Sequence, residues 1–339
     1  MPMSQPTSKI DIFTHIMPVR YRERLLKIAP PGLDIILNVE STPTVFDLDQ
    51  RFRIMDKFEG LRQVLTLSAP PVEQVADPKQ AIDLARLAND GMAELVNKYP
   101  ERFAAGVASL PMNNMDAALV ELDRAIKDLG LKGVQVLTPV NEKPMDAPEF
   151  RPLFEKMAGY DLPVWIHPRR GQNYPDYRTE EESKYRVFSV FGWPYETTVA
   201  MTRIVFSGIL ETYPNLKLIT HHCGGMVPFL RERVIGSYDR IFKDLKDDVR
   251  QRLSKPHVEY YRMFYNDTAI NGNTSALMCA YEFCGADHLL FATDNPFDTE
   301  LGERNLRQVI GAIEKMAIPA SEKKKIFEGN ARKLLALAG

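Results

Sequence analysis

Short apolar, β-branched runs alternate along the chain with longer segments whose apolar residues recur at helical spacing. The runs are apolar nearly throughout, as in VLTLS and VWIHP, which is typical of strands covered by helices on one face and by barrel packing on the other. This pattern predicts eight strands: Lys9–His15, Gln63–Ser68, Phe103–Leu110, Gly133–Val140, Pro163–Pro168, Lys217–His222, Phe264–Ala269 and Leu289–Asp294.

Helices are predicted between these strands, among them Gln80–Tyr99, Asn114–Gly130, Glu149–Tyr160 and Thr197–Tyr213. Strands and helices that alternate in this number favour an α/β fold closed into a (β/α)₈ TIM-like barrel. The rival is an open doubly wound sheet, but no Gly-rich phosphate turn follows the first strand. No composition break divides residues 1–339, so we expect a single domain with long loops at about 171–195 and 229–257.

Charge and composition restrict the partners of the chain. The formal net charge is −2, and acidic and basic residues are scattered along the whole length. We therefore expect no nucleic-acid or membrane partner and a small-molecule substrate. The first residues lack an apolar signal core, and three cysteines are too few for a disulfide framework. A reducing, cytoplasmic location is expected.

Potential metal ligands gather where the predicted strands end, which is the end of a barrel that carries the active site. Four of the six histidines and one aspartate lie there. Neutral imidazoles with a carboxylate and an open position suit a catalytic divalent ion. The residues are His15, His167, the pair His221 and His222, and Asp294.

Some of these positions have simpler explanations. A single histidine at a strand end is often a hydrogen-bonded structural residue, and His257 and His288 lie outside the pattern. If the strand continues through His221 and His222, their side chains point in opposite directions and one of them faces the site. Asp267 is expected either to line the mouth or to form an ordinary hydrogen bond. For the same reason of alternation, Cys223 is expected to be a packing residue.

Five segments resemble motifs of the amidohydrolase superfamily. Within it they are similar to the decarboxylase branch that includes α-amino-β-carboxymuconate-ε-semialdehyde decarboxylase and γ-resorcylate decarboxylase. The order and spacing of the segments suit a barrel. They are IDIFTHIMP from Ile10, RFRIMD from Arg51, WPYETT from Trp193, HCGGMVP from His222 and ATDNP from Ala292.

This resemblance implies metal ligands at His15, His167 and Asp294. It also implies that His222 is the acid/base residue, acting beside Asp294, and that His221 lies on the structural side. Substrate carboxylates are expected to be bound by Arg51 and by Arg233, with Arg53 as a further candidate. In some relatives the arginine at the position of Arg233 acts across a dimer interface.

The chain departs from the family pattern at Phe13, where relatives carry the first metal ligand of the His pair. Phenylalanine cannot ligate, so metal affinity should fall while Phe13 lines the substrate site. Trp193, with Phe191 and Phe297, is expected to wall a slot for a ring. Glu196 is expected to cap the following helix or to orient His167.

The resemblance implies one divalent metal ion, with Zn²⁺ expected and Mn²⁺ as the alternative. The expected activity is non-oxidative decarboxylation of a small aromatic or unsaturated carboxylic acid by a homodimer or homotetramer. A changed metal shell also leaves open a hydrolase or hydratase that attacks a carbon–carbon, amide or lactone bond. A non-catalytic binder of small ligands is the third hypothesis.

Overall fold

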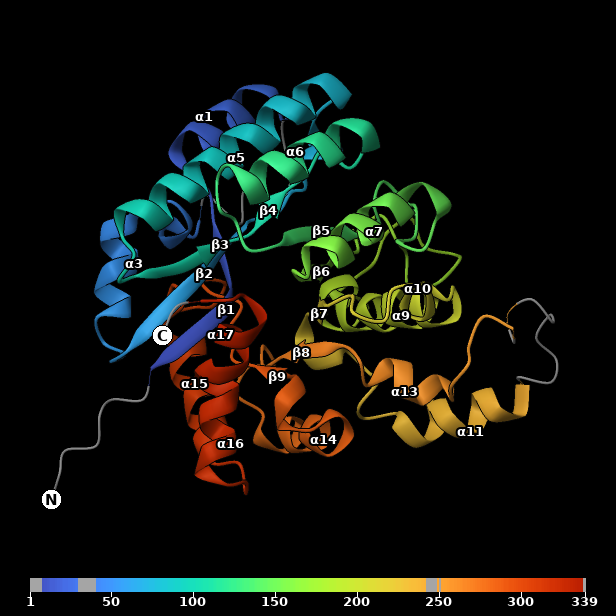
Figure 1. Cartoon of the computed structure of the whole chain (residues 1–339). Helices are drawn as coiled ribbons and strands as arrows, with labels where there is room; N and C mark the ends of the chain where they lie inside the picture. The colour runs from blue at the N-terminus through green and yellow to red at the C-terminus, as the bar shows by residue number, and fades with distance from the viewer. Residues whose placement is uncertain (1–7, 30–40, 242–248, 250, 338–339) are drawn as a thin grey trace, which may run out of the picture.

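A computed structural model describes residues 8–29, 41–241, 249 and 251–337 of the chain. Its strands are all parallel to their neighbours, in the orders β1-β2-β3 and β4-β5-β6-β7-β8-β9. Helices surround them on the outside (Figure 1). The strands are β1 (Lys9–Ile16), β2 (Leu61–Leu67), β3 (Phe103–Gly106), β4 (Ala108–Ser109), β5 (Val134–Thr138), β6 (Val164–Pro168), β7 (Leu218–Thr220), β8 (Tyr265–Asp267) and β9 (Leu289–Leu290).

Hydrogen bonds join the two groups of strands into a ring. β3 and β4 are two parts of one predicted strand, and Val107 between them donates its N–H to the carbonyl of Leu65 at 2.9 Å. At the other seam, His15 donates its N–H to the carbonyl of Asn295 at 2.7 Å, and Thr14 forms a parallel bridge with Asn295. The last strand thus returns to the first, and the fold is the predicted (β/α)₈ barrel.

The helices begin and end close to the predicted positions where a side chain caps them. Asp77 accepts from the N–H groups of Lys79 and Gln80 at the start of α5, and Asn114 does so for Ala117 in α6. The helices are α1 (Val19–Ile28), α3 (Leu48–Met55), α4 (Val72–Val75), α5 (Pro78–Lys98), α6 (Met115–Lys127), α7 (Arg151–Tyr160), α8 (Val187–Val190), α9 (Gly192–Phe206), α10 (Ile209–Thr212), α11 (Arg231–Ile241), α13 (His257–Tyr261), α14 (Thr274–Cys284), α15 (Glu303–Glu314), α16 (Ala320–Lys324) and α17 (Asn330–Leu334).

One predicted helix and the last predicted strand differ from the structure for identifiable reasons. The helix expected over Thr197–Tyr213 begins earlier, at Gly192, and breaks after Phe206, because Gly208 has φ +78° and cannot continue it. The last predicted strand is regular only over β9. Beyond it, the N–H of Ala292 is bound by the Thr268 hydroxyl at 2.9 Å instead of by a neighbouring strand.

The two long segments contain helices of their own. Residues 171–195 include α8 and the start of α9, and residues 229–257 include α11. In the second segment, residues 242–248 and 250 lie outside the described residues. None of the helices in the described part of the chain is long and apolar enough to cross a membrane.

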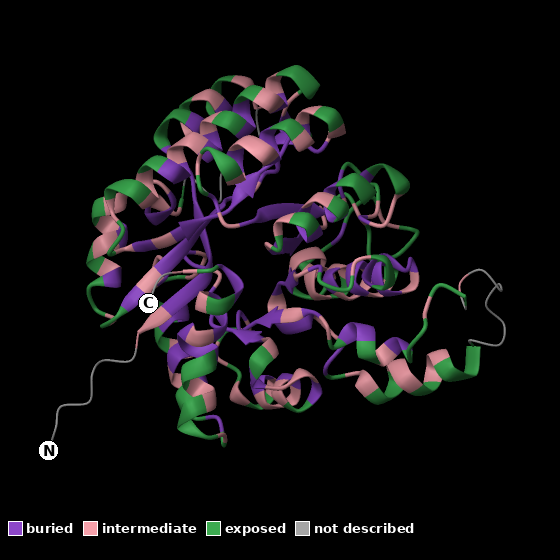
Figure 2. Cartoon of the chain, viewed as in Figure 1, coloured by how far each residue is buried: buried purple, intermediate pink, exposed green. Residues whose placement is uncertain are grey.

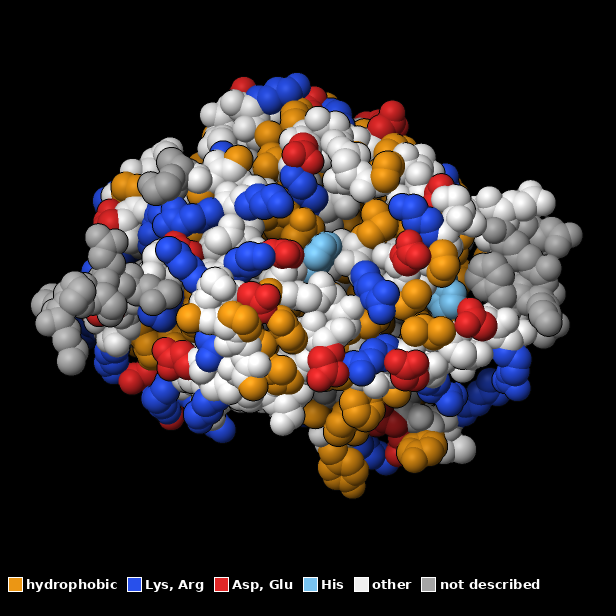
Figure 3. All heavy atoms as spheres, turned by 60° about the horizontal axis from the view of Figure 1, so that its bottom comes forward, with side chains coloured by type: hydrophobic (Ala, Val, Ile, Leu, Met, Phe, Trp, Pro, Cys, Tyr) orange, Lys and Arg blue, Asp and Glu red, His pale blue; other side chains and the backbone are white. Residues whose placement is uncertain are grey.

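Burial follows the layers of the barrel. The strands are buried, and the helices alternate between buried and exposed positions (Figure 2). On the face shown in Figure 3, acidic and basic side chains are intermixed. This face therefore carries both charge signs rather than a field of one sign.

Trp165 fills the centre of the barrel. Its side chain is fully buried, and its indole Nε1 donates to the carbonyl of Ile12 at 3.0 Å. Because β1 and β6 are not neighbours in the sheet, this bond crosses the interior. Side chains alternate along a strand, so Trp165 lies on the same face of β6 as His167 and forms a floor beneath it.

We expect Trp165→Ala to lower the free energy of unfolding by about 3–5 kcal/mol, because it leaves a cavity and an unpaired carbonyl in the core. Urea unfolding followed by circular dichroism measures the change. The control Val120→Ala alters a side chain that is 62% exposed on α6 and should stay within about 0.5 kcal/mol of the wild type. A loss below about 1 kcal/mol for Trp165→Ala would contradict its place as the floor.

Candidate metal centre

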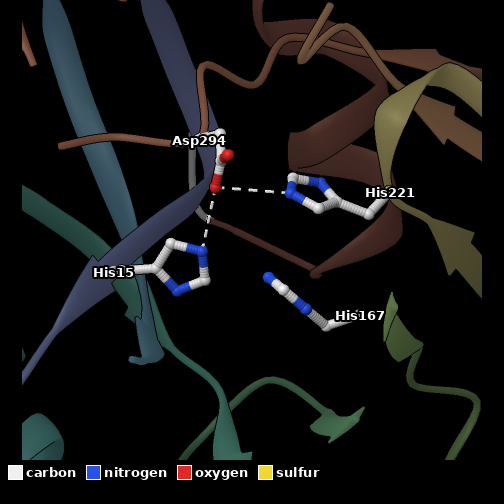
Figure 4. Close-up of side chains that lie close together, drawn as sticks. All are labelled: His15, His167, His221 and Asp294. Carbon is white, nitrogen blue, oxygen red and sulfur yellow. Dashed lines mark hydrogen bonds and ion pairs between the residues drawn. The ribbon is translucent and has the colours of Figure 1, made fainter. Parts of the chain in front are cut away.

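Three imidazoles and one carboxylate converge at the carboxyl ends of the strands (Figure 4). One potential ligand atom from each of His15, His167, His221 and Asp294 lies within 4.8 Å of all the others. Oδ1 of Asp294 is 3.0 Å from Nε2 of His15 and 3.3 Å from Nε2 of His221. The structure therefore brings together the three predicted ligands and adds His221, while their binding of an ion stays a prediction.

Each of the three imidazoles has a hydrogen-bond partner at Nδ1. Such a partner takes the ring's proton at Nδ1 and leaves Nε2 with a lone pair. This is how histidine ligands of metal ions are usually oriented. The pairs are His15 Nδ1 with the hydroxyl of Thr66 at 3.4 Å, His167 Nδ1 with the carbonyl of Pro168 at 2.8 Å, and His221 Nδ1 with the carboxylate of Asp267.

The charges of the centre suit a divalent cation. Burial raises the pKa of Asp294, but the neighbouring His221 and His15 outweigh it and hold that pKa well below its usual range. Burial lowers the pKa of His221, but Asp267 and Asp294 raise it overall to about 10. The pKa of His167 is lowered by burial and by His221. An ion that replaced the proton on His221 would leave neutral rings and two carboxylates, Asp294 and Asp267, whose charge balances 2+.

His221 and His222 do not point in opposite directions, so the expectation based on strand alternation was wrong. The regular strand ends at Thr220, and both His222 and Cys223 have φ 54°, which turns the chain. The two imidazole rings lie 4.0 Å apart. His221 joins the centre rather than the structural side of the barrel. Cys223 is buried, as expected of a packing residue.

His222 lies at the edge of the centre, next to Trp193. The ring centroids of His222 and Trp193 are 6.3 Å apart. Among the described residues, Nδ1 of His222 has no hydrogen-bond partner. Burial, and then the neighbouring His221, lowers the pKa of His222 to about 3. His222 is thus a neutral imidazole with an unused ring nitrogen, and its acid/base role stays a prediction.

Phe13 faces the centre. Its side chain is fully buried, and its ring stacks on His221 with centroids 4.1 Å apart and planes inclined by 26°. The ring centroids of His15 and His167 lie 5.6 and 5.7 Å away. Position 13 therefore contributes an apolar wall at the place where the resemblance implies a ligand.

Two of the three aromatic residues expected around a substrate ring lie beside the centre. Trp193 is 5.9 Å from His167 between ring centroids, and Phe297 is 5.4 Å from His15. Phe191 is 63% exposed and does not wall the site within this chain.

The predicted arginines lie in different environments. Arg51 is 2% exposed, and its Nη1 donates to the carbonyl of His15 at 2.7 Å, so it fixes the end of β1. Among the described residues its Nη2 has no partner. Arg53 is exposed two residues further along α3, on another face of the helix because a helix turns by about 200° over two residues, and its role stays a prediction. Arg233 is exposed on α11, and its role stays a prediction.

Asp267 is the functional residue that sequence reasoning left undecided. It is fully buried, binds His221 and accepts the N–H of Cys223 at 2.9 Å. Parallel pairing of Thr220 with Asn266 sets this contact, since His221 directly follows β7 and Asp267 is the next residue of β8. The alignment of β7 with β8 was the signal that could have identified Asp267 as the partner of His221.

Glu196 does not orient His167, since the carbonyl of Pro168 occupies His167 Nδ1. This part of the expectation was wrong. Glu196 lies inside α9, beyond its first turn, rather than before the helix. The early start of α9 therefore also removes its expected place as a cap.

Comparison with known proteins agrees with this geometry. A family model described as amidohydrolase matches residues 10–337. A γ-resorcylate decarboxylase from Polaromonas sp. is 32% identical over 296 residues, which cover 85% of this chain and 87% of the relative. A 2-amino-3-carboxymuconate-6-semialdehyde decarboxylase from Dictyostelium discoideum is 29% identical over 344 residues, covering 97% and 92%.

A solved structure is similar over almost the same length. The dihydroxybenzoic acid decarboxylase from Polaromonas sp. JS666, with bound manganese and the inhibitor 2-nitroresorcinol, superposes with a TM-score of 0.78 at 29% identity. The match covers 97% of both chains. By its sequence, its barrel and the histidines and aspartate at the strand ends, the chain belongs to the amidohydrolase family.

Proposed function

We propose that the protein is a metal-dependent, non-oxidative decarboxylase of a small aromatic or unsaturated carboxylic acid. The observation that carries this proposal is the convergence of three imidazoles, each held by a partner at Nδ1, on the carboxylate of Asp294. The relatives named γ-resorcylate decarboxylase and 2-amino-3-carboxymuconate-6-semialdehyde decarboxylase support it. So does a 6-methylsalicylic acid decarboxylase from Penicillium expansum, which is 27% identical over 334 residues.

His15, His167 and Asp294 would hold the ion. Imidazole and carboxylate donors suit both Zn²⁺ and Mn²⁺, and the manganese in the similar Polaromonas structure supports Mn²⁺ over the Zn²⁺ first expected. When bound, such an ion supplies Lewis-acid stabilisation and a fixed anchor for a substrate carboxylate or a neighbouring oxygen.

The proton is the second requirement of the reaction. A proton forms a new C–H bond at the carbon that carries the carboxylate; the C–C bond then breaks, its electron pair stays with the ring, and CO₂ leaves. We assign proton delivery to His222, whose Nδ1 has no other partner among the described residues. Asp294 raises the pKa of His222 against burial, and a substrate carboxylate beside the ring would raise it further.

Binding of the substrate would use the residues around this centre. Phe13, Trp193 and Phe297 supply apolar ring contacts. The Nη2 of the buried Arg51 has no partner among the described residues and is a donor for an anionic group.

Arg233 would act from a second copy of the chain. Its exposed position on α11 suits the homodimer or homotetramer that we propose. Tyr177, Tyr185 and Phe229 are 72%, 93% and 81% exposed, and exposed aromatic groups of this kind support a protein interface.

The three unpaired cysteines suit the reducing environment of the cytoplasm, which we propose as the location.

Phe13 favours one alternative, a hydrolase or hydratase in the same site, because a changed metal shell alters the chemistry that a centre supports. Incubating the purified, metal-loaded protein with γ-resorcylate, 6-methylsalicylate and related acids in D₂O separates the two. A decarboxylase releases CO₂ and places one deuterium at the vacated carbon. Turnover without CO₂ would favour the alternative, and metal loading without any turnover across the panel would count against both enzymes.

Loss of a residue that only supports a metal ligand weakens metal binding by about 10–100-fold. We expect Asp294→Ala, which removes a ligand itself, to reduce metal affinity by more than this. Metal content after dialysis, measured by elemental analysis, reports the change. Asp298→Ala is the matched control, since its carboxylate binds the N–H groups of Glu300 and Gly302 instead. Equal metal content in both variants would show that Asp294 is not a ligand.

We expect His222→Asn to lower kcat by about 10²–10⁴-fold, the usual contribution of a positioned acid or base. Its metal content should match the wild type because His222 lies outside the group of converging ligand atoms. Steady-state CO₂ release and elemental analysis on the same sample test both statements. Near-normal kcat would remove His222 from the mechanism.

We expect Arg233→Ala to raise KM by about 10–100-fold, which corresponds to the loss of one charge-assisted hydrogen bond. Arg240→Ala, on the same helix α11, should leave KM unchanged. Mixing Arg233→Ala chains with His222→Asn chains tests action between copies. Recovery of activity in the mixture requires Arg233 to reach the partner's site, and no recovery would contradict it.

A further inference from the structure

Position 13 carries a phenylalanine that cannot bind a metal ion, and the ring of a histidine lies against it. Phe13 stands where the resemblance to the family implies a ligand, so His15, His167 and Asp294 are only three protein donors. The ring stacked on Phe13 is His221, at 4.1 Å. We propose that His221 is the fourth protein ligand of the ion and replaces the donor absent at position 13. This inference rests on the proposed metal dependence.

The unsatisfied nitrogen of His221 is the first argument. Its side chain is completely buried, and among the described residues its Nε2 has no hydrogen-bond partner. Leaving a buried polar atom without a partner is unfavourable. Nε2 lies 3.3 Å from Oδ1 of Asp294, so a cation between the two atoms would satisfy both.

The fixed orientation of the ring is the second argument. Asp267 binds Nδ1 of His221 and is itself held by the N–H groups of Cys223 and Ala269, at 2.9 and 3.0 Å. A carboxylate that holds the far nitrogen of an imidazole is the arrangement that surrounds metal-ligating histidines. Phe13 packs on the face of the same ring, so rotation away from the centre is opposed from two sides.

The spacing of the four donors is the third argument. Tetrahedral bonds of about 2.1 Å separate ligand atoms by about 3.4 Å. The four donor atoms lie within 4.8 Å of one another, so small inward movements of the side chains bring all of them to an ion. His222 does not belong to this group, although its ring is only 4.0 Å from that of His221. In this proposal His221 binds the ion, and the next residue, His222, transfers the proton.

Metal titration of matched variants tests the proposal. We compare Mn²⁺ and Co²⁺ affinity, by calorimetry and chelator competition, for the wild type, His221→Ala and His222→Ala. Loss of a ligand should weaken binding by more than about 100-fold in His221→Ala, since outer-sphere losses alone cost about 10–100-fold. His222→Ala should bind as the wild type does. Equal affinity of all three proteins overturns the proposal.

Position 13 offers a rescue of the same variant. In a His221→Ala background, Phe13→His places an imidazole at the adjacent position and should recover most of the lost affinity. In the wild-type background, Phe13→His should tighten binding further. Failure of the rescue in a folded, dimer-competent double variant would count against replacement of one donor by the other.

A measurement on the unmutated protein avoids any folding defect of the variants. Pulsed electron paramagnetic resonance of the Cu²⁺-loaded wild type counts bound imidazoles, and three are expected from His15, His167 and His221. Two imidazoles would exclude His221 and leave the proposed function intact. A wild-type protein that takes up no divalent ion at all would overturn the proposed function together with this inference.

Discussion

The contact of Asp294 with His15 is the constraint on which the site depends. These residues are 279 positions apart in the chain, and their side chains meet at 3.0 Å only because the last strand returns to the first. The N–H of His15 binds the carbonyl of Asn295, next to Asp294. Asp294 itself has φ 59°, a left-handed conformation that Asp tolerates better than most residues. Closure of the barrel and assembly of the centre are therefore one event.

Side chains, rather than strand pairing, complete the backbone around the centre. The carboxylate of Asp11 accepts the N–H of Thr293 at 3.1 Å, and the hydroxyl of Thr268 accepts that of Ala292. Arg51 binds the carbonyl of His15. Regular hydrogen bonding between neighbouring strands would fix the direction of each strand, and the residues at its carboxyl end could not turn toward the centre. Substituting side-chain bonds allows the ends of β1 and β9 to aim their ligands while every one of these backbone groups stays paired.

Apolar periodicity was sufficient to predict the barrel and to place His15, His167 and Asp294 at the ends of strands, because parallel strands must end at one face. It was insufficient for His221 and His222. Their assignment required knowing that the strand stops at Thr220 and that His222 takes a positive φ, and neither property appears in a hydrophobic pattern. For Arg53 the resemblance supplies a position in the chain but not the face of α3 on which it lies, and its role stays a prediction.

The indole of Trp165 limits how substrate and products can reach and leave the centre. Because it bridges the interior from β6 to Ile12, the indole blocks the barrel axis on that side, and a substrate would have to approach from the loops that follow the strands, where active sites of such barrels lie. The substrate acid, CO₂ and the decarboxylated product would then all pass the same side of the barrel. A lingering aromatic product would then stand in the path of the next molecule, so the loops that shape the entrance govern release as much as they govern choice of substrate.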